Sequence, residues 1–249
     1  MKKKTLFLVL GLFGLTAFLY SQEVEDLIVQ ADKLYAEMKD MATAEQARVL
    51  YHEAIVKDRD NYDAYWKMSR ILYYIGAHKD SKNDKKIIFS QGIYYAQRAV
   101  ERQSEKPDGY YWLGVNYGVY GEARGVLKSL FLVDDIKEAM NKVVELDRSY
   151  EDGGPDRVLG RMYFKLPGFA GGSKEKSLEH LLKSKEFGPN DPVTRVYLAD
   201  TYLALKEVDK AREELEFVLN MELDPRWMTG VEDGKKDAQE MLNRKKFSK

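Results

Sequence analysis

GYYWLGVNYG, residues 109–118, is the stretch of this sequence that decides the fold. It combines a bulky Tyr110 with the pair Leu113 and Gly114 and, three residues later, Tyr117. Residues three and four apart share one face of a helix, so these side chains form a single stripe. The order leucine, small residue, tyrosine recurs in DRVLGRMY (156–163) and RVYLADTY (195–202), where the bulky first position is lost. The chain therefore contains an internally repeated helical unit.

A second set of segments carries small residues at fixed spacing, as the partner helix of a tightly packed pair requires. These positions are Ser177, Leu181 and Ser184 before Pro189, then Ala47, Tyr51 and Ala54, and finally Ala211, Leu215 and Val218. Alternation of the two kinds of segment is typical of the tetratricopeptide repeat, a 34-residue pair of antiparallel helices. Successive leucine–small pairs are 46 and 39 residues apart here, which predicts extended helices or loops in some units.

We expect an all-α solenoid with five helix pairs and a polar C-terminal capping helix, because a repeat stack must cover its last apolar face. The predicted pairs cover residues 23–60, 61–107, 108–152, 154–190 and 191–225, and the capping helix runs from Glu232 to Phe247. Residues 22–249 are then a single domain.

Turn chemistry marks several of these boundaries. Thr43 with Gln46 and Asp135 with Glu138 have the spacing of a capping box. Asp191 precedes a proline that would stand at the first helical position. Glycines at 153–154 and at 168, 171 and 172 predict breaks between helices.

The first 21 residues have the pattern of a secretory signal peptide. Lys2, Lys3 and Lys4 precede an apolar run from Leu6 to Tyr20, which is short for a membrane span. The chain has no cysteine, so this leader lacks the lipidation site of bacterial lipoproteins. We expect an exported, periplasmic or secreted protein, with no transmembrane helix once the leader is removed.

Composition favours a folded protein without general affinity for nucleic acid. The chain contains 40 Lys and Arg against 41 Asp and Glu, a net charge of −1, and is 44% hydrophobic. Nucleic-acid binders normally carry a clear basic excess.

Signals of catalysis are weak, and we predict a protein that is not an enzyme and needs no cofactor or metal. The three histidines, His52, His78 and His180, have no short metal-binding spacing. GGSKEKS (171–177) lacks the order of a phosphate-binding loop. Asp134 and Asp135 are explained by helix capping.

The inner surface of the predicted solenoid is the candidate binding site, because first-helix side chains project there. The predicted groove residues are Trp66, Arg70, Tyr73, Tyr111, Arg157, Arg161 and Phe164. Aromatic side chains there could anchor a partner or simply pack between repeats. The arginines, which packing would not select, suggest contact with a carboxylate.

Two blocks of the sequence also carry a family resemblance. SLFLVDDIKEAM (129–140) and YEDGGPDRVLGRMYFKLPGFAGGSKEKSLEHLLKS (150–184) resemble the T component of tripartite ATP-independent periplasmic (TRAP) transporters, over roughly residues 110–225. The second block also resembles the eukaryotic regulator-of-microtubule-dynamics proteins. The T-component resemblance implies a periplasmic helical-repeat subunit that associates with the solute-binding subunit, handles apolar organic ligands and can oligomerise.

These observations predict a recognition protein. The first hypothesis is an accessory transporter subunit that binds a periplasmic solute-binding subunit, an apolar carboxylate ligand, or both. The alternative is a general protein-interaction scaffold in envelope assembly, holding an extended peptide in the same groove. A small ligand calls for an enclosed cavity, whereas a peptide calls for a groove open to solvent.

Overall fold

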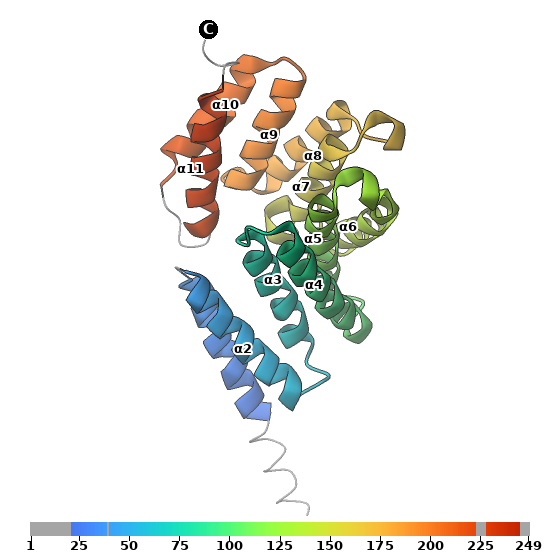
Figure 1. The fold of residues 1–249 in the computed structure, drawn as a ribbon, viewed down its shortest axis with the longest axis vertical. Coiled ribbons are helices and arrows are strands. Elements are labelled where there is room, and N and C mark those ends of the chain that lie inside the picture. The colour runs from blue at the N-terminus through green and yellow to red at the C-terminus, as the bar shows by residue number, and fades with distance from the viewer. Residues whose placement is uncertain (1–20, 39, 223–227, 245–249) are drawn as a thin grey trace, which may run out of the picture.

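The computed structural model describes residues 21–38, 40–222 and 228–244, and every regular element in these ranges is a helix (Figure 1). Five helix pairs follow one another as predicted, and a further helix follows the fifth pair. The first pair comprises residues 21–36 and α2. The labelled elements are α2 (Met41–Lys57), α3 (Tyr62–Ala77), α4 (Lys82–Arg102), α5 (Pro107–Arg124), η1 (Val126–Leu132), α6 (Val133–Asp147), α7 (Tyr150–Lys165), η2 (Gly168–Ala170), α8 (Lys174–Phe187), α9 (Pro192–Ala204), α10 (Val208–Asn220) and α11 (Met228–Leu242).

The small residues on the second helices set the register of each pair. All the predicted packing positions of α2, α8 and α10 are fully buried. Gly160 on α7 faces α8 so closely that a Cβ there would lie 2.7 Å from Leu181 Cγ and 3.1 Å from the Ser177 carbonyl oxygen. The predicted repeat register is therefore confirmed at the α7–α8 pair.

The long spacing between repeats comes from two 3₁₀ turns inserted between the helices of a pair. The turn η1 separates α5 from α6 in the third pair, and η2 lies between α7 and α8 in the fourth. Both insertions connect the two helices of one unit, so the stack keeps its tetratricopeptide order.

Helix caps agree with the sequence at one predicted position and differ at two. Asp191 caps α9 and accepts hydrogen bonds from the N–H groups of Val193 and Thr194. The prediction for Thr43 is wrong, because Asp40 is the N-cap of α2 and accepts from the Thr43 N–H. The prediction that Asp135 caps a helix is wrong as well, since α6 begins at Val133. Asp134 and Asp135 lie instead in the first turn of α6, where the positive end of the helix dipole stabilises their negative charges.

The connection between α6 and α7 is the most strained backbone in the described part of the chain. Glu151, Asp152 and Gly153 have φ values of 50°, 53° and 75°, so three consecutive residues are left-handed and regular helix resumes at Gly154. A Cβ at Gly153 would lie 2.8 Å from the Ser184 carbonyl oxygen. Glycine is therefore required there by both conformation and space. The break predicted at residues 153–154 is confirmed.

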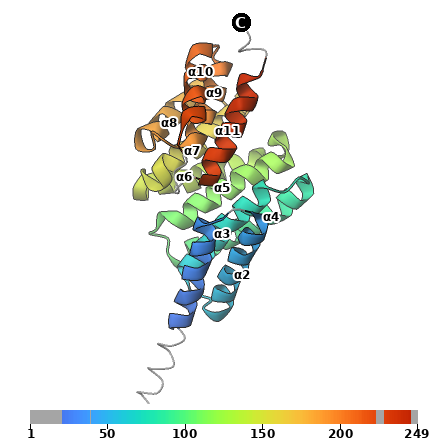
Figure 2. The same ribbon diagram turned by 90° about the vertical axis from the view of Figure 1, so that its left-hand side faces the viewer.

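The stack is curved, with the first helix pair at one end and α9–α11 at the other (Figure 1). Figure 2 shows α11 lying alongside α9 and α10, and the buried side chains of Ala238 and Met241 belong to the same apolar cluster as residues of those two helices. The predicted capping helix is thus confirmed, although α11 begins at Met228 rather than Glu232. Its predicted end at Phe247 is outside the described residues.

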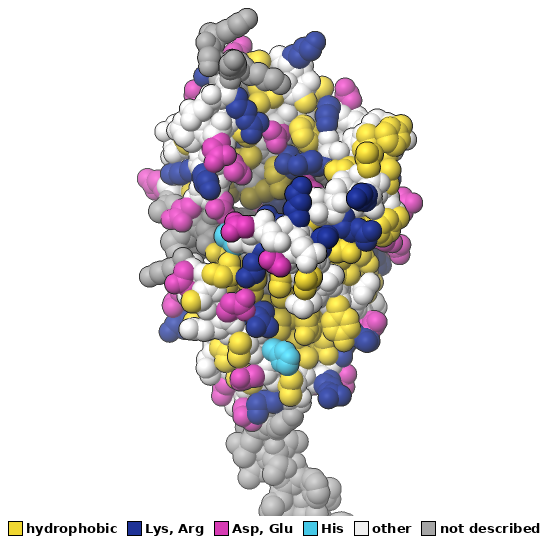
Figure 3. All heavy atoms as spheres, in the orientation of Figure 1, with side chains coloured by type: hydrophobic (Ala, Val, Ile, Leu, Met, Phe, Trp, Pro, Cys, Tyr) yellow, Lys and Arg dark blue, Asp and Glu magenta, His cyan; other side chains and the backbone are white. Residues whose placement is uncertain are grey.

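Charged side chains of both signs are interspersed over the face of the molecule shown in Figure 3, with apolar side chains between them. This mixture agrees with the net charge of −1. The face thus lacks the broad basic field that general binding of nucleic acid requires.

Within the described ranges, no helix has both the length and the hydropathy that a membrane span requires. The predicted leader, residues 1–21, lies outside these ranges except for Ser21.

Candidate functional site

The inner face of the curved stack contains a cavity of about 740 Å³. The first helices of the second to fifth pairs supply most of its wall, α11 borders it at the C-terminal end, and the cavity stays partly open to solvent. Residues near the end of α3, among them His78, also contribute, and His78 Nε2 lies 3.9 Å from Asp233 Oδ2 on α11. Tyr35 of the first helix also lines the cavity, so the curvature of the stack brings the first and last described helices to one site.

One side of the cavity is apolar. The side chains there come from α5, η1, α6 and α7: Trp112, Val115, Val119, Val126, Leu132, Val133, Ile136, Val158, Met162 and Leu166. An apolar wall with a few polar groups is the usual character of a binding site.

Aromatic rings form a second part of the wall. The rings of Tyr111 and Trp112 meet edge to face with centroids 5.2 Å apart, and Tyr73 lies 5.7 Å from Trp112. Burial raises the pKa of Tyr111 to about 12, against the opposing effect of Arg157. The Tyr111 phenol is therefore neutral at physiological pH.

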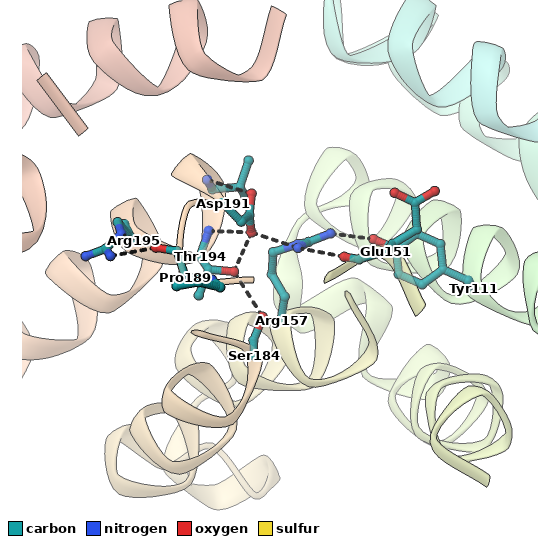
Figure 4. Close-up of polar contacts among 9 residues, drawn as sticks. Tyr111, Glu151, Arg157, Ser184, Pro189, Asp191, Thr194 and Arg195 are labelled. Atoms are coloured by element: carbon teal, nitrogen blue, oxygen red, sulfur yellow. Dashed lines mark hydrogen bonds and ion pairs between the residues drawn. The ribbon is translucent and has the colours of Figure 1, made fainter. Parts of the chain in front are cut away.

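Arg157 lies at the centre of a buried polar network (Figure 4). Its Nη1 donates to Asp191 Oδ2 at 2.7 Å and to the Glu151 carbonyl oxygen at 3.3 Å, and its Nη2 donates to the Tyr111 hydroxyl at 2.8 Å. Burial alone would lower the pKa of Arg157, but Asp191 and Tyr111 outweigh that effect and raise it. The guanidinium is charged, and its hydrogen bonds link α5, the strained turn between α6 and α7, and the start of α9.

Asp191 has a double role in this network. The carboxylate that caps α9 also pairs with Arg157, and it accepts a hydrogen bond from the Thr194 hydroxyl. Thr194 Oγ1 is 3.0 Å from Ser184 Oγ on α8. The predicted cap is therefore also the link between the fourth and fifth pairs.

The other two arginines of the predicted groove are paired in the same way. Arg161 Nη1 lies 2.8 Å from Asp200 Oδ2 on α9, and its guanidinium stacks 4.2 Å from the Tyr197 ring centroid. Arg70 Nη2 lies 3.4 Å from Asp32 Oδ1 in the first helix, and its guanidinium is 3.7 Å from the ring centroid of Tyr35. Each arginine therefore connects the first helices of neighbouring pairs.

This pairing corrects one step of the sequence argument. The arginines suggested an anionic ligand because repeat packing would not select them. In the structure their carboxylate partners belong to the protein itself, so no anion is needed to explain them.

Five of the seven predicted groove residues line the cavity: Arg70, Tyr73, Tyr111, Arg157 and Arg161. Trp66 and Phe164 do not line it. Trp66 Nε1 donates to Asp63, and Phe164 lies under the Lys174 ammonium, which is 3.8 Å from its ring centroid. The structure thus brings together residues from three predicted pairs.

Sequence reasoning missed three kinds of cavity residue. Trp112 was passed over although it neighbours the predicted Tyr111. Glu151 lines the cavity because the strained turn directs the backbone there. The glycines that follow it, Gly153 and Gly154, were the only indication of this turn in the sequence. Asp233 and Asp237 on α11 come from the far end of the chain and had no signal in the sequence.

The histidines lie in separate places, as their sequence spacing indicated. His180 Nδ1 is 2.7 Å from Asp156 Oδ1, and Arg148 makes two hydrogen bonds to the same carboxylate. In the ranges that the structure describes, no group of three or more potential metal ligands is present. In GGSKEKS, Gly171 is left-handed and Ser173 caps α8, so residues 171–173 form a turn and the remaining four residues begin α8.

Solved structures support the repeat fold. A thermophilic TPR protein of Thermus thermophilus superposes with a TM-score of 0.66 over 88% of this chain and 98% of that one, at 15% identity. The pilF protein of Pseudomonas aeruginosa gives 0.58 over 92% of this chain and 96% of that one, at 13% identity. At such identities the likeness shows the fold alone.

Curated proteins of similar sequence share one name. Regulator of microtubule dynamics protein 1 of Mus musculus is 25% identical over 200 residues, which are 74% of this chain and 63% of the mouse protein. Regulator of microtubule dynamics protein 3 of Rattus norvegicus is 22% identical over 210 residues, 78% of this chain and 44% of the rat protein. The matched regions therefore span less than two thirds of each relative's length.

These relatives overturn the transporter hypothesis. The prediction of a TRAP T component, and with it the solute-binding subunit as partner, is wrong, because the family that matches is a different one. Its model, described as regulator of microtubule dynamics protein 1-3, covers residues 27–166, more than half of the chain. The chain belongs to the regulator of microtubule dynamics protein 1–3 family.

Proposed function

We propose that this protein is a non-enzymatic interaction module that holds a segment of a partner protein in its inner cavity. The observation that carries the proposal is the cavity of about 740 Å³ on the inner face of the stack. Its volume is within the usual range of roughly 300–1,000 Å³ for binding sites. Helical solenoids commonly use this concave face for recognition.

The opening of the cavity to solvent favours a peptide as the occupant, because an extended segment can enter it from outside. Trp112 is 7% exposed, lines the cavity, and its indole N–H has no acceptor in the described part of the chain. Arg70 Nε is buried without an acceptor as well. Both atoms are inaccessible to solvent, so an occupant of the cavity does not reach them in this conformation.

The absence of enzymatic activity is part of the proposal. Arg157, Arg161 and Arg70 are engaged in ion pairs between helices, which leaves them without a free role in acid–base chemistry. The relatives are named as regulators of microtubule dynamics, and recognition of a protein is compatible with such a role.

Export also belongs to the proposal, on the strength of the basic and apolar pattern of residues 1–21. Amino-terminal sequencing of the protein recovered from its host would test it. A mature terminus near Gln22 is expected, and an intact Met1 would contradict export.

Filling the cavity tests peptide binding directly. A Cβ at Gly118 on α5 would meet nothing within 4 Å, and Gly118 lines the cavity. Gly168 in η2 has the same open space but does not line the cavity, so it provides the matched control. Random 12-residue peptides selected by phage display on the full chain would be synthesised and titrated by calorimetry.

Gly118→Trp should weaken binding of the selected peptides at least tenfold, whereas Gly168→Trp should leave it unchanged. Selection of no peptide, or of peptides that bind Gly118→Trp as tightly as the wild type, would contradict the proposal.

A further inference from the structure

The balance of charge in the cavity identifies the chemistry of its occupant. Each Lys or Arg side chain of the wall already has a carboxylate partner, and Asp32, the partner of Arg70, is shared with Lys67 at 2.5 Å. The pairs are Arg70–Asp32 at 3.4 Å, Arg157–Asp191 at 2.7 Å, Arg161–Asp200 at 2.8 Å and Lys165–Glu122 at 3.6 Å. In the described part of the chain, these pairs use every Lys and Arg that lines the cavity.

Three carboxylates of the wall are left over: Glu151, Asp233 and Asp237. None forms an ion pair with Lys or Arg among the described residues, and Asp233 instead lies 3.9 Å from His78, which is charged only when protonated. Asp233 and Asp237 are one helical turn apart on α11, so their side chains lie on the same face. The cavity therefore carries an excess of negative charge.

Glu151 is the innermost of these groups. Figure 4 shows it with Tyr111 on one side of the Arg157 guanidinium, opposite Asp191. Its carbonyl oxygen accepts from Arg157, and no hydrogen bond to its carboxylate is present in the described ranges. Burial raises the pKa of Glu151, against the opposing effects of Arg157 and Arg70. The carboxylate thus lies in a poorly solvated place without a partner of its own.

The surroundings of Glu151 are suited to a cation. Tyr73 and Tyr111 line the same cavity, and the faces of aromatic rings attract cations. The rings of Tyr35 and Tyr197 already hold the guanidinium groups of Arg70 and Arg161. A buried carboxylate gains most from an opposite charge that arrives with hydrogen-bond donors. Lysine and arginine side chains supply both, and their methylene stems fit an apolar wall.

We infer that the partner segment carries a basic side chain which enters past Asp233 and Asp237 and pairs with Glu151, while a neighbouring apolar side chain fills the pocket between α5, α6 and α7. This inference rests on the proposed function. It differs from the carboxylate ligand expected from the sequence. Ion pairs within the protein neutralise the cavity arginines, whereas, among the described residues, Glu151, Asp233 and Asp237 keep unpaired negative charges.

The test uses peptides selected on the full chain as above. Each Lys of the tightest peptide is replaced in turn by norleucine, which keeps the stem and removes the charge, and binding is measured by calorimetry to the wild type and to Glu151→Gln. Glu122→Gln is the matched control, because Glu122 is another cavity carboxylate but already has Lys165 as its partner. Thermal unfolding confirms that each variant is folded.

At one lysine position of the peptide, the wild-type protein and the Glu122→Gln variant should both bind the lysine peptide at least tenfold more tightly than the norleucine peptide. Glu151→Gln should bind the two peptides equally and should unfold at no lower temperature than the wild type, because it removes a poorly solvated charge. Peptides without basic residues, or a Glu151→Gln variant that keeps the preference for lysine, would overturn the inference. If binding is also insensitive to Gly118→Trp, the proposed function itself fails.

Discussion

Arg157 and Asp191 form a buried ion pair, and the two side chains are 10% and 1% exposed. Replacing Arg157 by Met would leave the carboxylate of Asp191 buried without its cation. Breaking such a pair typically costs about 3–5 kcal/mol. We therefore expect Arg157→Met to lower the free energy of unfolding by that amount, measured by urea denaturation.

Arg161→Met is the control for this prediction. Arg161 and Asp200 are each 22% exposed, so water can solvate the remaining carboxylate. A loss nearer about 1 kcal/mol is expected for this better-solvated pair. Equal losses in the two variants would contradict the argument from burial.

Gly160 and Gly118 should respond to substitution in opposite directions. Gly160→Leu would drive a side chain into Leu181 and the Ser177 backbone, and overpacking of this kind costs roughly 1–3 kcal/mol. Gly118→Ala meets open space in α5, so it should stabilise the protein by about 0.5–1 kcal/mol. Chemical denaturation measures both, and wild-type stability of Gly160→Leu would refute the α7–α8 register.

At the scale of elements, Asp156 joins three helices through the side chains of Arg148 at the end of α6 and His180 on α8. Burial alone would raise the pKa of Asp156, but hydrogen bonds from His180 and Arg148 hold it below its usual value. A depressed carboxyl pKa stabilises the folded state above the unfolded value of about 3.9, and that stabilisation is lost as the pH falls through the folded pKa.

We therefore expect the free energy of unfolding to fall as the pH decreases from about 4 toward 2. The fall should be shallower in Asp156→Asn, which cannot titrate at this position. Urea denaturation across this pH range would measure both slopes, and identical slopes would exclude Asp156 as a contributor.

At the scale of the whole molecule, α11 covers the last apolar face of the stack and also lines the cavity. Ala238→Asp would place a charge at a fully buried position between α11 and its neighbours, with an expected cost of roughly 3 kcal/mol or more. Lys236→Asp puts the same side chain on the exposed face of α11 and should have little effect. Thermal unfolding and size-exclusion chromatography would detect loosening of the end, and equal behaviour of the two variants would contradict the packing of α11.

Local patterns were enough to predict the helix pairs. The leucine–small–tyrosine stripes of the first helices pack against the small residues of the second helices. These contacts lie within one pair, so the residues that make them recur at fixed positions along each helix. The caps were less predictable, because Asp40 and Thr43 are both chemically suitable and only the actual backbone geometry selects Asp40. The transporter hypothesis was wrong because the blocks that suggested it lie in repeat segments, which report fold more directly than function.

The sequence by itself determined an all-α repeat stack, its five pairs, its terminal helix and five residues of the cavity wall. Only the tertiary structure decided what those residues do. Carboxylate partners of the arginines come from other pairs, 34 residues away for Arg157 and 39 for Arg161, and the acids of α11 reach the cavity through the curvature of the whole stack. The net charge of a cavity depends on which charged side chains of different repeats form ion pairs. The residue pattern along one helix does not specify those contacts.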